Sequence, residues 1–394
     1  MKKQLNQILK PVISLALVIS LLGCNYSHAG PHQETDLPSN KETARTSSQK
    51  IMLALLLDTS NSMDGLIDQA KSQLWTVVNE LAAAKAEDGA SPEINIALFE
   101  YGNDGLPSAE GHIRMVVNLT NDLDEISEQL FKLTTNGGDE YCGQVIKKSI
   151  DKLEWGASEA DLKMIFIAGN EPFTQGKVNY EIACALAKDK DIVVNTIFCG
   201  AHGEGISTSW RRGAELTGGS YMSIEQDRKT VYVKTPYDDK IDLLNKSLNK
   251  TYLYYGSKGR AYKEKQLAQD SNAETYGKAN MAKRAISKSS HVYKNSSWDL
   301  VDAIEDDEAV LDDLKDENLP EEMKTMSKTE RKAYIQKQAN ARQSIQKEIR
   351  DLGVKRKRYI IESQSAQSKE GMLDDALIQA IKKQAKSKKL ELNP

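Results

Sequence analysis

The sequence has little of what several functional classes require. Its 394 residues include only four cysteines and five histidines, too few for a disulfide scaffold, and no HExxH pair of a zinc hydrolase occurs. Aromatic residues make up 6% of the chain, and the formal net charge is only −4. The composition therefore indicates neither a nucleic-acid-binding protein nor a polyanionic tail.

The small net charge conceals two oppositely charged parts. Residues 1–250 contain 25 basic and 34 acidic side chains, whereas residues 251–394 contain 28 basic and 23 acidic ones. At about 150 residues per domain, the length leaves room for two domains. The sequence predicts an acidic first part joined to a mildly basic second part.

The N-terminus is predicted to direct the chain to a bacterial cell envelope. Three lysines precede an apolar run at residues 12–22, which is typical of a secretory signal and too short for a membrane-spanning helix. The run ends in LLGC at residues 21–24, which resembles a lipoprotein box. The resemblance implies removal of residues 1–23 and acyl chains on Cys24 that anchor the protein to a membrane. The alternative is an ordinary cleaved signal, and the membrane and its face stay open.

Residues 24–50 are predicted to be a flexible tether and residues 51–227 one α/β domain. The tether is poor in large aliphatic side chains, whereas residues 51–57 (IMLALLL) are a continuous apolar run typical of a buried strand. Strand and helix patterns alternate after it, which predicts a doubly wound, mostly parallel sheet that binds ligands at the carboxyl ends of its strands. Strands are expected at 94–99, 113–117, 163–168 and 192–198, and helices at 65–85, 123–133, 143–153 and 179–188.

The loop after the first strand carries a candidate metal site. Asp58, Ser60 and Ser62 form a D-x-S-x-S pattern, and a carboxylate with two hydroxyls on alternate residues offers the oxygen ligands that hard divalent cations prefer. Asp and Ser are also favoured as helix N-caps, so capping is the alternative interpretation. The position of the motif between a buried strand and an amphipathic helix favours the metal.

In this context the motif resembles the first loop of a metal-ion-dependent adhesion site in a von Willebrand factor type A domain. The resemblance covers roughly residues 51–224. It implies a Rossmann-like fold, a divalent cation (Mg²⁺, Ca²⁺ or Mn²⁺), and non-covalent binding of a protein or peptide whose acidic group completes the coordination of the ion.

The second and third loops depart from the family pattern. Asp139 stands where the resemblance leads us to expect a threonine, and Gly169 or Asn170 stands where an aspartate is expected. We hypothesise that the second carboxylate has moved to Asp139, with Glu140, Asn170 or Glu171 completing the shell directly or through water. The alternative is a degenerate site that binds protein without a cation.

The remaining cysteines do not indicate catalysis. In an oxidising compartment, one disulfide and one buried thiol are expected among Cys142, Cys184 and Cys199. A nucleophile built from Cys142 or Cys199 with His112 or His202 lacks an evident oxyanion loop or orienting acid. We therefore predict that the protein is not an enzyme.

Residues 228–394 are predicted to be a mostly helical extension. Residues 261–290 contain few large aliphatic side chains, which indicates weak burial. A capping box at residues 327–330 predicts a long helix at about 328–363, which is expected to pair with residues 372–386 as a helical hairpin or coiled coil.

Charged clusters in this extension are predicted to be solvated surfaces. They comprise an acidic cluster at residues 305–317 and basic runs at 355–358 and 382–389. Nucleic acid is not expected as a partner of an exported lipoprotein.

The sequence thus predicts an envelope protein that binds a protein or peptide ligand through a modified metal site. The alternative is a metal-independent scaffold, in which a degenerate α/β domain and the helical extension assemble an envelope complex.

Overall fold

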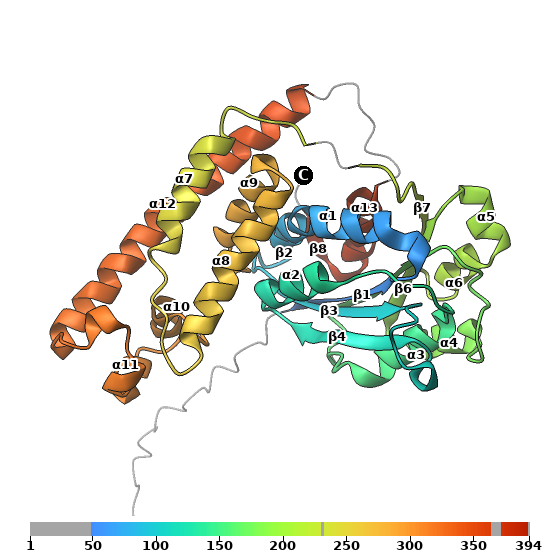
Figure 1. The fold of residues 1–394 in the computed structure, drawn as a ribbon, viewed down its shortest axis with the longest axis horizontal. Helices are drawn as coiled ribbons and strands as arrows, with labels where there is room; N and C mark the ends of the chain where they lie inside the picture. The colour runs from blue at the N-terminus through green and yellow to red at the C-terminus, as the bar shows by residue number, and fades with distance from the viewer. Residues whose placement is uncertain (1–48, 230–231, 364–371, 393–394) are drawn as a thin grey trace, which may run out of the picture. The chain divides into compact units, whose positions relative to one another are not determined.

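The computed structural model describes residues 49–229, 232–363 and 372–392, and residues 47–394 form one compact unit (Figure 1). The expected signal peptide, Cys24 and nearly all of the tether lie outside the described residues. Within those residues, no helix is long and apolar enough to cross a membrane.

A six-stranded sheet forms the centre of the α/β part. Its order is β4-β3-β1-β5-β6-β7, and all neighbours are parallel except β3 and β4. The doubly wound, mostly parallel sheet expected from the sequence is confirmed. The strands are β1 (Lys50–Asp58), β3 (Glu93–Tyr101), β4 (Ile113–Thr120), β5 (Leu162–Gly169), β6 (Ile192–Cys199) and β7 (Tyr221–Ile224).

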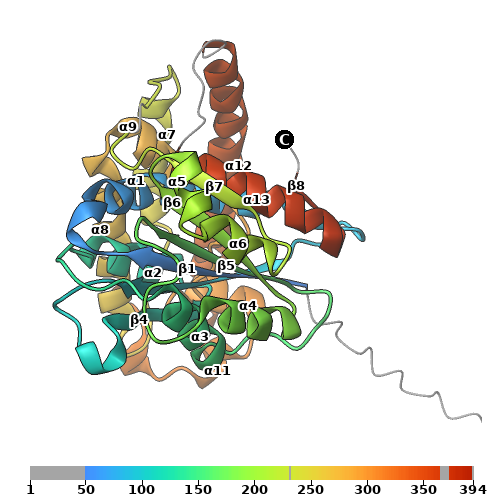
Figure 2. The ribbon, with the colours of Figure 1, turned by 90° about the vertical axis from the view of Figure 1, so that its right-hand side faces the viewer.

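Helices cover both faces of this sheet. Because side chains alternate along a strand, Leu53 and Leu57 of β1 contribute to one core, whereas Ala54 and Leu56 contribute to the other. The first core is covered by α1 and α2 and the second by α3 and α4 (Figures 1 and 2). The helices of this part are α1 (Asp64–Ala82), α2 (Leu123–Lys132), α3 (Cys142–Lys152), α4 (Tyr180–Asp189), α5 (His202–Ser207) and α6 (Trp210–Glu215).

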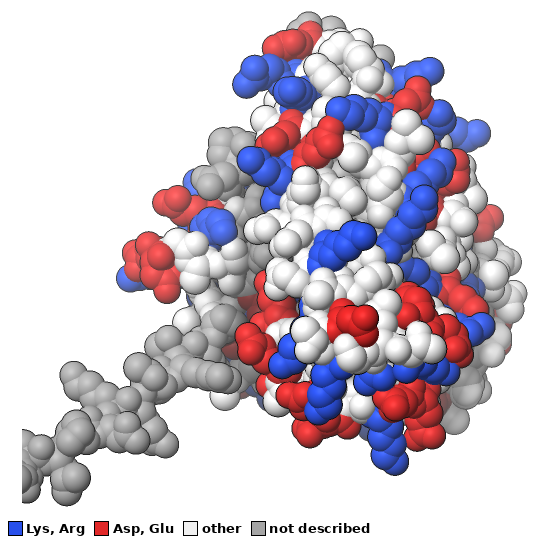
Figure 3. Space-filling view, turned by 90° about the vertical axis from the view of Figure 1, so that its left-hand side faces the viewer, with Lys and Arg blue, Asp and Glu red and all other residues white. Residues whose placement is uncertain are grey.

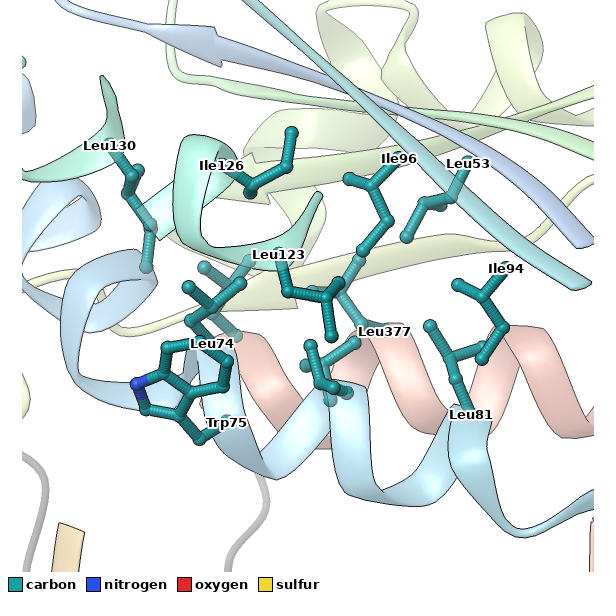
Figure 4. Packing of buried hydrophobic residues seen from close by; sticks show 14 of the residues in the cluster. Leu53, Leu74, Trp75, Leu81, Ile94, Ile96, Leu123, Ile126, Leu130 and Leu377 are labelled. Atoms are coloured by element: carbon teal, nitrogen blue, oxygen red, sulfur yellow. The ribbon is translucent and has the colours of Figure 1, made fainter. Parts of the chain in front are cut away.

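The larger core lies between the sheet and α1. Trp75 and Leu81 of α1 are fully buried, and they belong to the same cluster as Ile94 and Ile96 of β3 and Leu377 of a C-terminal helix (Figure 4). Burying each such side chain stabilises the fold by about 1.5–3 kcal/mol. Residues from near both ends of the described chain therefore share one core.

The last described helix returns to the α/β part. α13 (Leu373–Ala385) packs against α1 and β7 (Figure 2). The short strands β2 (Ala84–Ala86) and β8 (Leu390–Leu392) pair antiparallel. The helical hairpin that we expected from residues 328–363 and 372–386 is therefore not formed, because the apolar face of α13 is buried in the core beside α1.

A helical part is inserted between β7 and α13. Its longest helix begins where the capping box predicts, and it packs on α7, α9 and α10. The helices are α7 (Asp238–Asn249), α8 (Gly259–Thr275), α9 (Lys278–Lys288), α10 (Leu300–Asp306), α11 (Val310–Asp313) and α12 (Lys328–Ser363).

Buried charges join α8 and α9 to the α/β part. Nη1 of Arg284 in α9 lies 2.8 Å from Oδ1 of Asp124 in α2, and its Nε lies 2.6 Å from Oδ1 of Asp270 in α8. Lys288 Nζ lies 2.9 Å from the other oxygen of Asp270. Burial alone would raise the pKa of Asp270, but Lys288 and Arg284 hold it below its ordinary value. The expectation of weak burial in residues 261–290 was wrong, because the buried groups here are largely polar.

A second buried network fixes α12. Nη1 of Arg342 lies 2.6 Å from Asp299 Oδ2 and 2.5 Å from Asp302 Oδ1, and its Nη2 donates to the carbonyl oxygen of Thr251 at 2.7 Å. Burial and the neighbouring charge of Asp299 raise the pKa of Asp302 to about 6. One arginine thus connects α12 to the α7–α8 connection and to α10.

The acidic cluster of the helical part is exposed, as expected. The acidic residues within 305–308 and 312–317 all lie at the surface. On the face shown in Figure 3, acidic side chains gather toward one end, and basic and acidic side chains are interspersed over the rest.

Loss of the buried side chain of Arg284 should destabilise the whole unit. Arg284→Met leaves Asp124 and Asp270 with an uncompensated charge, so we expect the free energy of unfolding to fall by about 3–5 kcal/mol. The matched control is Lys278→Met, because the Lys278–Asp239 ion pair is exposed. Chemical denaturation should show a lower midpoint for the first variant and an unchanged midpoint for the second; equal midpoints would contradict the role of the network.

Stability should also depend on the protonation of Asp302. Its pKa is raised in the folded state, so its contribution is present below the unfolded value near 3.8 and is lost as the pH rises through about 6. Between pH 5 and pH 7 we expect the wild type to lose about 1 kcal/mol more than Asp302→Asn. Denaturation curves of both proteins at both pH values measure this difference. An equal loss of the free energy of unfolding in the two proteins would refute the prediction.

Candidate metal site

The candidate site lies at the carboxyl edge of the sheet. In the parallel register, Asp58 at the end of β1 is level with Tyr101 at the end of β3. On the other side, Leu57 is level with Ala168, next to the end of β5. The loops that follow these strands therefore meet at one edge of the sheet. This brings Asp58 close to the third-loop residues, as the sequence predicted.

The first loop presents oxygen atoms without using them as helix caps. The side chain of Asp58 is fully buried, and its Oδ1 accepts a hydrogen bond from the backbone N–H of Ser60 at 2.8 Å. The Oγ atoms of Ser60 and Ser62 lie 3.2 Å apart. Ser60 precedes a short 3-10 helix but makes no side-chain cap hydrogen bond, so the structure does not support the capping interpretation.

The second loop brings Glu140, rather than Asp139, to Asp58. Asp139 is exposed, and its Oδ2 accepts a hydrogen bond from Tyr141 Oη at 2.8 Å. Glu140 is buried to 4% exposure and lies within reach of Asp58 and Ser60. Gly102 makes this approach possible, because a Cβ there would lie 2.8 Å from both Asp58 Oδ1 and Glu140 Cγ. Glu140, which we expected only in the outer shell, is thus the residue that faces Asp58.

The electrostatics of this pair are unfavourable without a counter-charge. Burial, followed by the charge of Glu140, raises the pKa of Asp58 well above its ordinary value. Burial also raises the pKa of Glu140. Asp58 Oδ2 and Glu140 Oε2 are buried and have no hydrogen-bond partner in the described part of the chain, which is the condition that a bound cation relieves.

The third loop contributes an amide. Asn170 Nδ2 donates to Ser62 Oγ at 3.2 Å, and its Oδ1 is buried without a partner among the described residues. The side chain of Glu171 is exposed, and its carbonyl oxygen accepts a hydrogen bond from Trp210 Nε1 at 2.8 Å. Asn170 is therefore joined directly to the first loop, whereas Glu171 lies at the rim.

Tyr101 fills the space that a third-loop carboxylate would need. Its side chain is fully buried, and its hydroxyl donates to the carbonyl oxygen of Ala168 at 2.9 Å. A Cβ on Gly169 would overlap this hydroxyl and lie 3.1 Å from Asp58 Oδ2. Sequence reasoning missed Tyr101, whose role depends on a register that the motif alone does not reveal.

The cysteines near the site are buried thiols. Cys142, Cys184 and Cys199 are all free and buried, so the disulfide expected among them is not formed. Cys142 begins α3 and lies 4.0 Å from the Tyr101 hydroxyl, and burial raises the pKa of its thiol well above the ordinary value. The same cause raises the pKa of Cys199. Thiols that resist ionisation are poor nucleophiles.

The donor set fits a hard divalent cation. Asp58 and Glu140 supply two buried carboxylates, the first-loop serines two hydroxyls, and Asn170 an amide oxygen. These are oxygen ligands of the kind that Mg²⁺, Mn²⁺ and Ca²⁺ prefer. Within the described residues, no cluster of three or more His, Cys, Asp or Glu side chains is arranged to hold a metal, so such a site here depends on hydroxyl and amide ligands as well.

The fold is that of an α/β domain with an oxygen-rich edge at the carboxyl ends of its strands. Residues 53–206 match the family model described as von Willebrand factor type A domain. The match leaves the helical insertion and α13 unassigned. No curated protein matches the chain.

Solved structures with a similar arrangement come from several sources. Conserved hypothetical protein BatB of Bacteroides thetaiotaomicron is 14% identical with a TM-score of 0.34, over 44% of this chain and 90% of that chain. An aerotolerance-related membrane protein from Bacteroides fragilis is 14% identical with a TM-score of 0.31, over 45% and 93%. Proximal thread matrix protein 1 from the mussel byssus, with a zinc-occupied MIDAS motif, is 13% identical with a TM-score of 0.34, over 46% and 43%.

The contact between Tyr101 and Gly169 predicts that removing the tyrosine hydroxyl reduces the cost of a side chain at position 169. Gly169→Ala should lower the free energy of unfolding by about 1–3 kcal/mol, because the new Cβ overlaps the tyrosine hydroxyl. In a Tyr101→Phe background the same substitution should cost less. Gly203→Ala is the control, since nothing lies within 4 Å of a Cβ there. A double-mutant cycle by chemical denaturation checks this, and additive effects would rule out the steric explanation.

Proposed function

We propose that this protein binds a protein or peptide ligand non-covalently through a divalent cation at the carboxyl edge of its von Willebrand factor type A domain. Domains of this family often mediate protein binding or adhesion, which supports binding rather than catalysis. The proposed ligands of the ion are Asp58, Ser60, Ser62 and Glu140, with Asn170 directly or through water.

The observation that carries the proposal is the pair of buried carboxylates. Two like charges that face each other away from water cost several kcal/mol unless a cation or a proton compensates them. The unpartnered oxygens of Asp58, Glu140 and Asn170 point to a cation as the natural compensation. When bound, the ion supplies an electrophilic coordination position for a ligand carboxylate, and the chain's own residues hold the ion in place.

The proposal places Glu140 in the role first expected for Asp139. Adjacent residues in an extended loop point to opposite sides, and here Asp139 is held at the surface by Tyr141. The total of two carboxylates stays as the sequence analysis expected. Lipidation at Cys24 and an envelope location remain part of the proposal and rest on the N-terminal sequence alone.

Metal binding should be visible as a gain in stability. In the full chain, Mn²⁺ or Mg²⁺ should raise the melting temperature, and chelator should reverse the rise. Asp58→Asn and Glu140→Gln should each abolish the rise and also stabilise the metal-free protein by about 1–3 kcal/mol, because each removes one of two repelling charges. Differential scanning calorimetry with and without metal measures both effects.

Asp139→Asn is the matched control for Glu140→Gln. It removes the neighbouring carboxylate from the same loop, and we expect the metal-induced shift to be retained. Loss of the shift in Asp139→Asn but not in Glu140→Gln would restore the assignment made from sequence. No shift in the wild type would instead favour the metal-independent scaffold.

A further inference from the structure

An amine, a carboxamide and a carboxylate meet inside the helical part. Lys288 is the last residue of α9, Asn249 is the last residue of α7, and Asp270 lies in α8. α9 packs against both α7 and α8 (Figure 1). Three different helices therefore bring together a potential nucleophile, a group that it can attack, and an acid–base group.

The three side chains contact one another pairwise. Lys288 Nζ lies 2.5 Å from Asn249 Oδ1 and 2.9 Å from Asp270 Oδ2, and Asn249 Nδ2 donates to Asp270 Oδ2 at 2.8 Å. Because a carbonyl bond is about 1.23 Å long, Lys288 Nζ lies no more than about 3.7 Å from the carbon atom of the Asn249 amide. This is close to the separation of about 3–3.5 Å from which a nucleophile attacks.

Burial favours the reactive form of the amine. The side chain of Lys288 is fully buried, and the ring centroid of the buried Tyr252 lies 6.0 Å from its Nζ. Burial lowers the pKa of Lys288 from its ordinary value to about 8, which increases the share of the neutral, nucleophilic amine near pH 7. The exclusion of water also disfavours hydrolysis of the Asn249 amide, which competes with attack by the amine.

Asp270 is placed to carry a proton between the other two groups. Its Oδ2 accepts hydrogen bonds from both Lys288 Nζ and Asn249 Nδ2. Its Oδ1 lies 2.6 Å from Arg284 Nε. Although burial raises the pKa of Asp270, Lys288 and Arg284 hold it below its ordinary value, so the group is a carboxylate that can accept a proton. A general acid–base group needs this contact with both the donor and the acceptor of the proton.

We propose that Lys288 and Asn249 form an intramolecular isopeptide bond, with Asp270 as the proton carrier. The lone pair of Nζ attacks the carbon of the Asn249 amide, and a new N–C bond forms. A proton passes from Nζ to Asp270 and from Asp270 to Nδ2, the bond between the carbon and Nδ2 breaks, and ammonia leaves. The reaction needs no oxidant, reductant or further reactant, and Asp270 ends in the protonation state in which it began.

The orientation of the Asn249 amide is the one that this reaction requires. Its oxygen faces the amine, so the carbon to be attacked is close to Nζ, and its nitrogen, which is the leaving group, faces the carboxylate that protonates it. The ion pair between Lys288 and Asp270 does not by itself require an amide at this place, because Arg284 already supplies a counter-charge to Asp270.

The bond joins the ends of α7 and α9 covalently. α9 carries Arg284, which contacts Asp124 of the α/β part, and α7 packs on α12. Like a disulfide, such a link stabilises the fold by restricting the unfolded chain. The cross-link involves none of the residues of the candidate metal site and does not depend on the proposed function.

Mass spectrometry of the denatured full chain tests the proposal directly. We expect most molecules to be lighter than their sequence requires by the mass of one ammonia molecule. A tryptic digest should contain one branched peptide that joins residues 249 and 288, without cleavage after Lys288, because its amine has become an amide. Recovery of Lys288 and Asn249 only in separate, unmodified peptides would overturn the proposal and leave an ordinary buried ion pair.

Two variants and one control assign the chemistry. Lys288→Met removes the nucleophile and Asp270→Asn removes the proton carrier, so both should lack the branched peptide. Lys263→Met is the matched control, because Lys263 Nζ donates to the backbone carbonyl oxygen of the same asparagine; this variant should be cross-linked like the wild type. Circular dichroism shows whether each variant is folded.

The variants also define the results that contradict the proposal. A branched peptide at Asn249 in Lys288→Met, or its loss in folded Lys263→Met, would assign the bond to another amine and overturn it. A cross-link that forms equally well in folded Asp270→Asn would overturn the role of the aspartate. If Asp270→Asn does not fold, the digests of the wild type and of Lys288→Met still decide whether the bond exists.

Discussion

Two carboxylates that face each other at the end of a buried strand organise this edge of the protein. Asp58 is placed by β1, and Glu140 reaches it past Gly102, where a side chain would collide with both. The surrounding loops are arranged around this repulsion: the serines turn their hydroxyls toward each other, and Asn170 joins the first loop through Ser62. Such a pair lowers the stability of the fold when no counter-charge is present, and under the proposed function a cation would supply that counter-charge.

Buried aspartates also occur in and beside the helical part, but there arginine side chains compensate their charge. Arg284 and Arg342 each lie between two buried aspartates, so acidic and basic groups compensate one another without an external ion. At the candidate metal site, residues 59–63, 134–141 and 170–174 contain no lysine or arginine that could play that part. The buried aspartates that contact Arg284 and Arg342 are thus compensated within the chain, which is why the Asp58–Glu140 pair, unlike them, supports the proposal of a bound cation.

The sequence was sufficient for features that depend on local pattern. The apolar run before Asp58, the amphipathic spacing of α1 and the capping box of α12 each identify an element from its own residues. The role of Glu140 could not be read in this way, because adjacent residues of a loop point in different directions and only the tertiary fold decides which one is buried. Tyr101 and Gly169 belong to different strands, so their contact depends on the register of the sheet.

The return of α13 to the α/β part has a consequence for how the chain reaches its native state. Leu373 and Leu377 complete a core whose other members lie on α1 and the first strands, so more than a hundred inserted residues must be made before that core can close. Contacts between such distant segments form slowly. Leu373 and Leu377 cannot cover the apolar side chains of α1 until the last helix has been made, so burial of this core depends on synthesis of the entire helical insertion.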